Sequence, residues 1–426
     1  MNTTSEPEFN TLAPVSQDYP LSAIPADARK FIWSLAPLLI GFTLSCGTLL
    51  AGGLVRPAFP LWPDLVGLII LGNLILGSYA AGLSYIAAKS GLSTILMARF
   101  SFGNVGSRWV DFILSFIQIS WYGWGSALIA DSLNKLMDVP VYLNWLTILV
   151  CIYLCCATAY FGYRFIDWLS RFAVSTMLFL MFWILAIAMS KLGGFEGLQA
   201  IQPTQQLAWG EALTIVVGTL ISNATQATNN RHLANTGRTT VITTLAAFLF
   251  VNGFFIICGA FSSLLYANED VVQTLAQEGL LFWGLLLLLL NMWTTQTNTI
   301  YAFSVAGSQI FRINKWIIFA LGGATLALVL AWGGIYIMLL PYLKLLGTFI
   351  SPLGGVIMSD YWLVHRGQFP SPEARQPAFN WAGIITYPIA SAIAYFYPGI
   401  KPINGFIAAV ILYFVLGKII GRGKRG

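Results

Sequence analysis

A dense polar cluster lies inside a long apolar stretch of the chain and contains Asn291, Thr294, Thr295, Gln296 and Asn298. Residues three or four apart share one face of a helix, so Asn291 faces the same way as Thr294 and Thr295. An amide offers a hydrogen-bond donor and an acceptor, and adjacent hydroxyls joined by backbone carbonyls suit a hard cation. Polar groups within a membrane are costly, so this cluster indicates that something polar binds there.

A second pair of residues could recognise a flat solute. Gln118 and Trp121 are three residues apart in another apolar run and therefore share a face. The indole offers a flat π surface, and the amides of Gln118 and Asn291 suit the hydrogen-bonding edges of a small, planar, neutral solute. The same amides could instead hold helices together, and Trp121 could simply pack within the membrane. Periodicity leaves both interpretations open.

The chain offers few groups for catalysis or metal binding. We expect His232 and His365, each beside an arginine, to be surface residues. The five cysteines lie in apolar runs without CxxC spacing, which argues against a disulfide framework or a metal site. No HExxH, GxSxG or P-loop pattern is present, and we place none of the acidic residues near the centre of a helix. We therefore expect no enzyme and no cofactor. A channel is disfavoured because the chain has no repeated filter sequence and no arginine-rich helix.

These residues must be positioned by membrane-spanning helices. The chain has 426 residues, of which 57% are hydrophobic and 9% charged, and the mean hydropathy is +0.75. Soluble domains carry about 25% charged residues, so the lipid bilayer must be the main solvent. A span needs about 20 apolar residues. We expect an all-α integral membrane protein with twelve transmembrane helices near 31–55, 62–88, 107–133, 141–162, 168–190, 209–227, 241–266, 279–308, 314–338, 341–363, 380–397 and 402–420.

The distribution of basic residues predicts the orientation. Of the 22 Lys and Arg residues, only those at 56, 135, 191, 344 and 401 fall on the side opposite the first tail. By the positive-inside rule both termini are cytoplasmic, so the net charge of +6 reflects topology rather than nucleic-acid binding. We divide the chain into a cytoplasmic tail (1–30) without a signal peptide's apolar region, a ten-helix transport core (31–363), two additional helices (364–420) and a basic cytoplasmic end (421–426).

Two apolar runs are interrupted by glycine and small hydroxyl residues. One interruption spans 41–48 in the first run and the other spans 218–225 in the sixth, five helices later. Paired interruptions in corresponding halves point to the binding site of a secondary transporter, because a broken helix leaves backbone polar groups that need a partner. Close helix packing is the alternative explanation.

Several strings, taken in order and spacing, resemble the cytosine permeases of the nucleobase–cation symporter-1 family. They are residues 41–53, 98–103, 116–125, 290–298 and 352–361, and the resemblance extends over about 25–420. It implies two inverted five-helix repeats with discontinuous first and sixth helices, followed by two further helices. It also implies a cation-driven importer of cytosine or a related nucleobase, with sodium as the coupling ion.

The resemblance implies a role for individual residues. Trp121 would stack on the substrate ring, and Gln118 and Asn291 would hydrogen-bond its edges. Thr219 and Leu220 would line the sixth-helix side, and Ser45 and Cys46 the first-helix side, although a packing role for Cys46 is also open. Sodium would be held by backbone oxygens of Gly41, Leu44 and Asn291 with the hydroxyls of Thr294 and Thr295.

Three departures from the family pattern concern the solute. Leu220 replaces an aromatic residue, Ser45 and Cys46 replace a larger and partly aromatic stretch, and residues 296–298 lack the family's acidic residue. Loss of aromatic pairing removes about 0.5–1.5 kcal/mol. The cargo could therefore be a purine, allantoin, a hydantoin-like ring or a hydroxymethylpyrimidine instead. We expect the protein to function as a monomer, with membrane lipid and a small heterocycle as its only partners.

Overall fold

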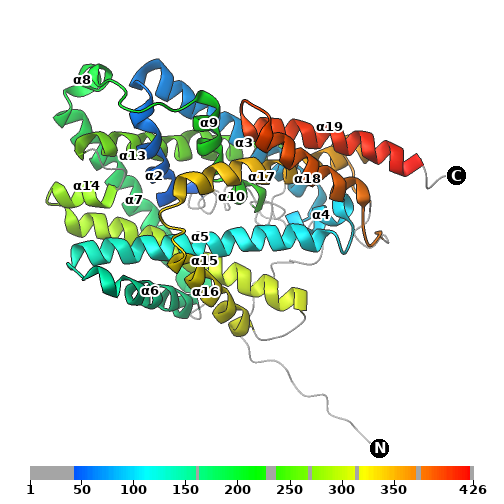
Figure 1. The fold of residues 1–426 in the computed structure, drawn as a ribbon, viewed down its shortest axis with the longest axis horizontal. Coiled ribbons are helices and arrows are strands. Elements are labelled where there is room, and N and C mark those ends of the chain that lie inside the picture. The colour runs from blue at the N-terminus through cyan, green and yellow to red at the C-terminus, as the bar shows by residue number, and fades with distance from the viewer. Residues whose placement is uncertain are drawn as a thin grey trace, which may run out of the picture.

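The computed structural model describes residues 43–159, 163–226, 237–266, 271–311, 316–370 and 376–422. Every regular element in these ranges is helical, and most long helices run roughly along the long axis of the molecule (Figure 1). The all-helical prediction is confirmed for this part of the chain. The elements, in chain order, are α2 (Cys46–Val55), η2 (Arg56–Ala58), η3 (Leu61–Leu65), α3 (Val66–Ser90), α4 (Thr94–Phe102), α5 (Ser107–Leu136), η4 (Val141–Leu143), α6 (Asn144–Ala159), α7 (Tyr163–Lys191), α8 (Gly194–Ala200), α9 (Trp209–Gly218), α10 (Ile221–Gln226), α12 (Gly237–Ala246), η5 (Ala247–Asn252), α13 (Gly253–Tyr266), α14 (Val271–Gln277), α15 (Leu281–Phe311), α16 (Trp316–Trp332), α17 (Leu339–Ser359), η6 (Asp360–Val364), α18 (Trp381–Phe396) and α19 (Lys401–Arg422).

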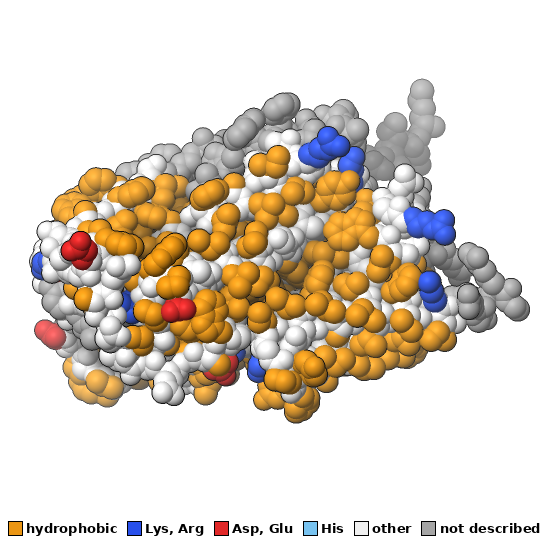
Figure 2. All heavy atoms as spheres, turned by 90° about the horizontal axis from the view of Figure 1, so that it is seen from above, with side chains coloured by type: hydrophobic (Ala, Val, Ile, Leu, Met, Phe, Trp, Pro, Cys, Tyr) orange, Lys and Arg blue, Asp and Glu red, His pale blue; other side chains and the backbone are white. Residues whose placement is uncertain are grey.

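Many of these helices have the length and composition of membrane spans. Within the described residues, seven stretches are long and apolar enough to cross a membrane: Leu61–Ser90, Ser107–Leu136, Val141–Thr158, Val174–Lys191, Gly237–Leu265, Leu339–Val364 and Lys401–Ile420. Three shorter apolar helices accompany them: Trp209–Gly218, Ile317–Trp332 and Trp381–Phe396. Orange apolar side chains cover most of the face in Figure 2, and charged side chains on it are few. This surface is suited to contact with lipid.

Three short helices were not expected from the apolar pattern: α4, α8 and α14. Each is nine residues or fewer, too short to span a bilayer. Of these, α4 starts with a clear cap, because the Ser93 hydroxyl accepts a hydrogen bond from the Leu96 N–H at 3.5 Å. The segment containing Arg99, which lies between the predicted spans 62–88 and 107–133, is therefore helical.

The buried interior consists of two apolar clusters. One contains residues of α2, α5, α6, α7, α13 and α15, and the other contains residues of α3, α4, α5, α10, α17, α18 and α19. The Trp121 ring packs against both clusters. The predicted binding residue on α5 therefore lies where the two halves of the interior meet.

Two glycines fix the position of α2 against α13. A Cβ at Gly52 would lie 2.1 Å from the carbonyl oxygen of Ile256, and one at Gly259 would lie 1.9 Å from that of Leu49. The two backbones are therefore in direct contact, an arrangement that only residues without a side chain allow. This crossing holds α2 in place immediately after its irregular start.

Candidate functional site

The chain is not helical just before α2. Ser45 is extended (φ −136°, ψ 133°), and its hydroxyl oxygen accepts a hydrogen bond from the Gly47 N–H at 3.2 Å. Leu44 is likewise outside the helix, whereas Thr43 has helical geometry. The break falls inside the predicted interruption at 41–48. It removes the helical hydrogen bonds of nearby backbone groups, which then require other partners.

The side chain of Asn291 satisfies two of these backbone groups. Its Oδ1 accepts from the N–H of Cys46 at 3.0 Å, and its Nδ2 donates to the carbonyl oxygen of Leu44 at 3.2 Å. Asn291 lies on α15, 1% exposed, and 245 residues from Cys46 in sequence. One amide thus uses both its donor and its acceptor to hold the broken helix, as a neighbouring backbone would. Its predicted hydrogen bond to the solute would have to be made in addition to these two.

Three oxygen atoms meet on the first turn of α15 beyond Asn291. The Thr294 and Thr295 hydroxyls donate to the carbonyl oxygen of Asn291 at 3.0 and 2.8 Å, and Thr294 also approaches the Leu290 carbonyl oxygen at 2.8 Å. A hydroxyl that donates one hydrogen bond keeps lone pairs for a cation. These three oxygens are the hard donors that sodium prefers. The Leu44 carbonyl oxygen, also a predicted ligand, accepts from the Asn291 side chain. Gly41, the remaining predicted ligand, lies outside the described residues.

The second break separates α9 from α10. α9 ends at Gly218 and α10 begins at Ile221, with Thr219 and Leu220 between them. The partners here are local: the Thr219 hydroxyl donates to the Val216 carbonyl oxygen at 2.7 Å, and the Ala224 N–H donates to that of Leu220 at 2.7 Å. Leu220 is buried in the second apolar cluster together with Ile117 of α5. This break lies within the predicted interruption at 218–225.

The two amides nearest this break bind each other. Gln118 Nε2 on α5 donates to Gln226 Oε1 on α10 at 2.8 Å, and both side chains are partly buried. The alternative interpretation of Gln118, that it joins two helices, therefore describes this contact. Gln226 follows directly on the interrupted string and was not predicted. Its neighbours in the chain, among them Asn223 and Thr225, are also polar, so no local signal singled it out.

Trp121 lies between the breaks. A Cβ on Gly47 of α2 would lie 3.1 Å from the Trp121 ring, so the indole covers the start of α2. The ring also makes edge contacts with Trp124 and Tyr342 at centroid distances of 5.3 Å. Tyr342 on α17 was not predicted, and its hydroxyl donates to the Ile117 carbonyl oxygen at 3.2 Å. The Trp121 side chain thus contacts α2 and α17, and Gln296 of α15 approaches the Trp121 carbonyl oxygen at 3.5 Å.

Part of the polar cluster on α15 has a packing role. Gln296 Nε2 donates to the Tyr122 carbonyl oxygen at 2.6 Å and approaches the Ser126 hydroxyl at 3.3 Å, both on α5. On the other side, the Thr297 hydroxyl lies 3.2 Å from that of Thr158 on α6. Asn298 has no described side chain. Gln296 and Thr297 therefore position α15, while Asn291, Thr294 and Thr295 face the break.

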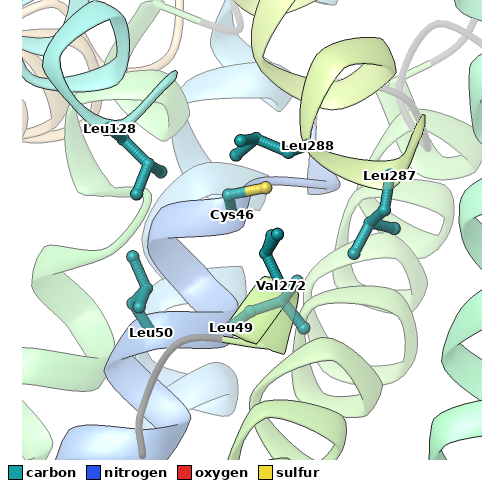
Figure 3. A pocket seen from close by; sticks show the side chains of 7 residues that line it. All are labelled: Cys46, Leu49, Leu50, Leu128, Val272, Leu287 and Leu288. Carbon is teal, nitrogen blue, oxygen red and sulfur yellow. The ribbon is translucent and has the colours of Figure 1, made fainter. Parts of the chain in front are cut away.

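Cys46 lines a small apolar cavity at the start of α2 (Figure 3). The other lining residues are aliphatic: Leu49, Leu50, Leu128, Val272, Leu287 and Leu288. The cavity measures about 10 Å³, and a single water requires about 10–15 Å³. A heterocycle does not fit there, and the position of Cys46 corresponds to the packing alternative. Ser45 is more accessible than Cys46 and caps α2.

His365, expected to be a surface residue, is partly exposed, at 25% of its side chain, and has a buried partner. Its Nδ1 lies 3.1 Å from the Asp360 carboxylate, whose other contacts are the hydroxyls of Ser101 at 2.9 Å and Tyr413 at 2.8 Å. The hydrogen bond to Asp360 raises the pKa of His365 above its ordinary value, and partial burial opposes this. The group joins α4, η6 and α19. His232, the other histidine, lies outside the described residues.

Comparisons with known proteins agree with this geometry. Residues 24–421 match the family described as permeases for cytosine/purines, uracil, thiamine and allantoin. The chain is 30% identical over 410 residues to the cytosine permease of Escherichia coli K12, covering 96% of both proteins. It is 22% identical to the hydantoin permease of Microbacterium maritypicum over 89% of this chain and 84% of that protein.

Two solved structures share the fold. The inward-facing conformation of Mhp1 superposes with a TM-score of 0.82 at 18% identity, covering 94% of this chain and 93% of that one. Mhp1 as a nucleobase-cation-symport-1 family transporter, closed with bromovinylhydantoin bound, superposes with a TM-score of 0.81. The family resemblance seen in the sequence is therefore confirmed: this chain belongs to the permease family for cytosine/purines, uracil, thiamine and allantoin, and it is a membrane transport protein.

Proposed function

We propose that this permease is a secondary transporter that imports cytosine or a related nucleobase together with sodium. The cytosine permeases among its relatives and the bound bromovinylhydantoin in Mhp1 support a small heterocyclic cargo. The single observation that carries the coupling is the Asn291 amide, which ties the broken start of α2 to the turn bearing Thr294 and Thr295. If the ion site and the solute site both include residues joined by the Asn291 amide, binding at one site can change the affinity of the other.

The coupling follows from the geometry. Sodium bound by the Asn291 carbonyl and the two hydroxyls would rigidify this turn of α15, and the Asn291 side chain would transmit that order to α2. Gly47 of α2 lies beneath the Trp121 ring, so a fixed α2 also fixes one wall of the solute pocket. Each ligand then strengthens the binding of the other by the same free energy. Alternating access by rocking of the repeats about this site completes the transport cycle.

The proposed setting is the cytoplasmic membrane, with both termini inside and one chain as the functional unit. Leu220 keeps the choice of cargo open, because an aliphatic wall accepts rings of different size. Purines, allantoin, a hydantoin and a hydroxymethylpyrimidine are therefore candidates beside cytosine.

Uptake into liposomes tests the proposal. Purified protein is reconstituted, and accumulation of radiolabelled cytosine is measured with an inward sodium gradient, with equal sodium on both sides, and with an inward proton gradient. We expect accumulation above equilibrium with the sodium gradient alone and recovery of unaltered cytosine. Accumulation driven only by protons would refute sodium coupling. The same assay is repeated with the other candidate heterocycles. Absence of saturable uptake for cytosine and for all of them would refute the cargo class.

A further inference from the structure

The Gln118–Gln226 contact is an incomplete amide dimer. One hydrogen bond is made, from Gln118 Nε2 to Gln226 Oε1 at 2.8 Å. The reciprocal bond is not: Gln226 Nε2 is buried and has no hydrogen-bond partner within the described part of the chain. Gln118 Oε1 likewise receives no hydrogen bond from the described residues. The pair therefore keeps one donor and one acceptor that no described residue satisfies.

An unused buried donor is costly, because it has lost its hydration without gaining a partner. The family resemblance does not predict Gln226, and helix packing alone would be served by an apolar side chain. An amide at this place, with one group satisfied and one unsatisfied, is the pattern expected where a ligand supplies the missing partner. The remaining groups are complementary to a ring edge that carries an acceptor and a donor side by side.

The surroundings of the pair suit a flat ring. Trp121 is three residues from Gln118 and shares its helix face, and its ring is partly accessible. Ile117, next to Gln118 in the chain, and Leu220 are buried members of one apolar cluster. A ring with its polar edge toward the glutamines would thus meet an aromatic face and an aliphatic wall, the usual composition of a small-molecule site.

We propose that Gln226 is a substrate-binding and specificity-determining residue, and that Gln118 and Gln226 together recognise a lactam edge, an N–H beside a C=O in a planar ring. The ring N–H donates to Gln118 Oε1, and the ring carbonyl accepts from Gln226 Nε2. Rotation of both amides exchanges the two roles, so the edge fits in either direction. This inference rests on the proposed function and narrows its cargo to unsubstituted lactam heterocycles.

The test compares two rings of the same shape on purified protein. Uracil has lactam edges, and 1,3-dimethyluracil keeps the carbonyls but has no ring N–H. Cytosine serves as a second lactam. Dissociation constants are measured by calorimetry for the wild type, Gln226→Glu and Gln226→Met, with Gln205→Glu in an exposed loop as the matched control. Thermal unfolding of each variant checks that it is folded.

We expect the wild type and the control to prefer uracil over 1,3-dimethyluracil by at least about tenfold. Both Gln226 variants should bind uracil and cytosine about tenfold more weakly. Their affinity for 1,3-dimethyluracil should change less than about twofold, because the methyl groups beside its carbonyls already keep the ring edge away from the two glutamines. Unchanged uracil affinity in the Gln226 variants would overturn the inference, and so would an equal loss for both rings, which would indicate a merely structural role. If the wild type binds none of the heterocycles, the proposed function itself fails.

Discussion

The two helix breaks of this permease differ in how the polar groups at the break are hydrogen-bonded. At the start of α2, the Leu44 carbonyl and the Cys46 N–H depend on the side chain of Asn291, which is far away in sequence. Between α9 and α10, the polar groups are satisfied within a few residues, through Val216 and Leu220. The first break is therefore coupled to another helix, and the turn at the second break is self-contained, although the far end of α10 is tied to α4 by the Thr94 hydroxyl, which donates to the Thr225 carbonyl oxygen at 2.7 Å. We infer that the first break responds to binding of the ion and that the second break contacts the solute.

The largest effect should follow removal of the Asn291 amide. Asn291→Ala removes the hydrogen bonds that the side chain makes to the Leu44 carbonyl and the Cys46 N–H in a buried site, and a polar group left unsatisfied there costs about 1–3 kcal/mol. We expect a marked fall in thermal stability in detergent and loss of uptake in liposomes. Asn291→Asp keeps the oxygen that accepts from the Cys46 N–H, so its loss of thermal stability and uptake should be smaller. If Asn291→Ala unfolds at the wild-type temperature, the first break does not depend on this side chain.

The next effect concerns sodium. Thr295→Ala removes one hydroxyl from the turn that binds the Asn291 carbonyl, so the sodium concentration for half-maximal uptake should rise by about tenfold, a loss of about 1.4 kcal/mol. Thr295→Ser keeps the hydroxyl and is the matched control. Cytosine affinity at saturating sodium should change little. If uptake by Thr295→Ala depends on sodium concentration as it does in the wild type, the Thr295 hydroxyl is not a sodium ligand.

Gln118→Ala tests the solute side at the second break. Truncation leaves a polar edge of the bound ring and Gln226 Oε1 without a partner, at about 1–3 kcal/mol. The dissociation constant for cytosine should therefore rise by about tenfold or more, with an unchanged sodium dependence of the remaining binding. Calorimetry at several sodium concentrations separates the two quantities. Unchanged cytosine affinity would move the pocket away from α5.

Thr219→Ala should have a smaller effect on stability than Asn291→Ala. The Thr219 hydroxyl bonds the Val216 carbonyl oxygen three residues before it, and a helix turn can largely replace such a local bond. We expect a loss of about 0.5–1.5 kcal/mol in stability, read from thermal unfolding, with Thr219→Ser as control. A loss as large as that of Asn291→Ala would show that the second break is not self-contained.

The smallest effect is expected away from both breaks, at His365. Its pKa is raised by the hydrogen bond to Asp360, so protonation stabilises the fold. This stabilisation is complete below the ordinary pKa of about 6.5 and is lost as the pH rises through the higher pKa of the folded protein. The melting temperature should fall slightly over that range, and His365→Gln should remove this dependence. A steeper pH dependence in His365→Gln would contradict the assignment.

The sequence predicted the helices and the breaks better than the contacts. Long apolar runs and glycine-rich interruptions depend on local composition, so the starts of α2 and α10 lie within the predicted ranges. The partner of each amide depends on tertiary packing. The contact of Asn291 with the solute stays a prediction, and the structure adds that its side chain holds the α2 backbone. Gln226 was missed because its neighbours in the chain are also polar. The buried partner of His365 was missed because Asp360 is five residues away across a helix end.

Linkage between ion and solute is the most direct test of the central claim, that Asn291 connects the two sites through the first break. The dissociation constant of cytosine is measured by calorimetry without sodium and at the sodium concentration that half-saturates the wild type, in the wild type and in Thr295→Ala. The claim predicts that sodium tightens cytosine binding several-fold in the wild type and much less in Thr295→Ala. Cytosine binding of the same strength with and without sodium in the wild type would contradict it.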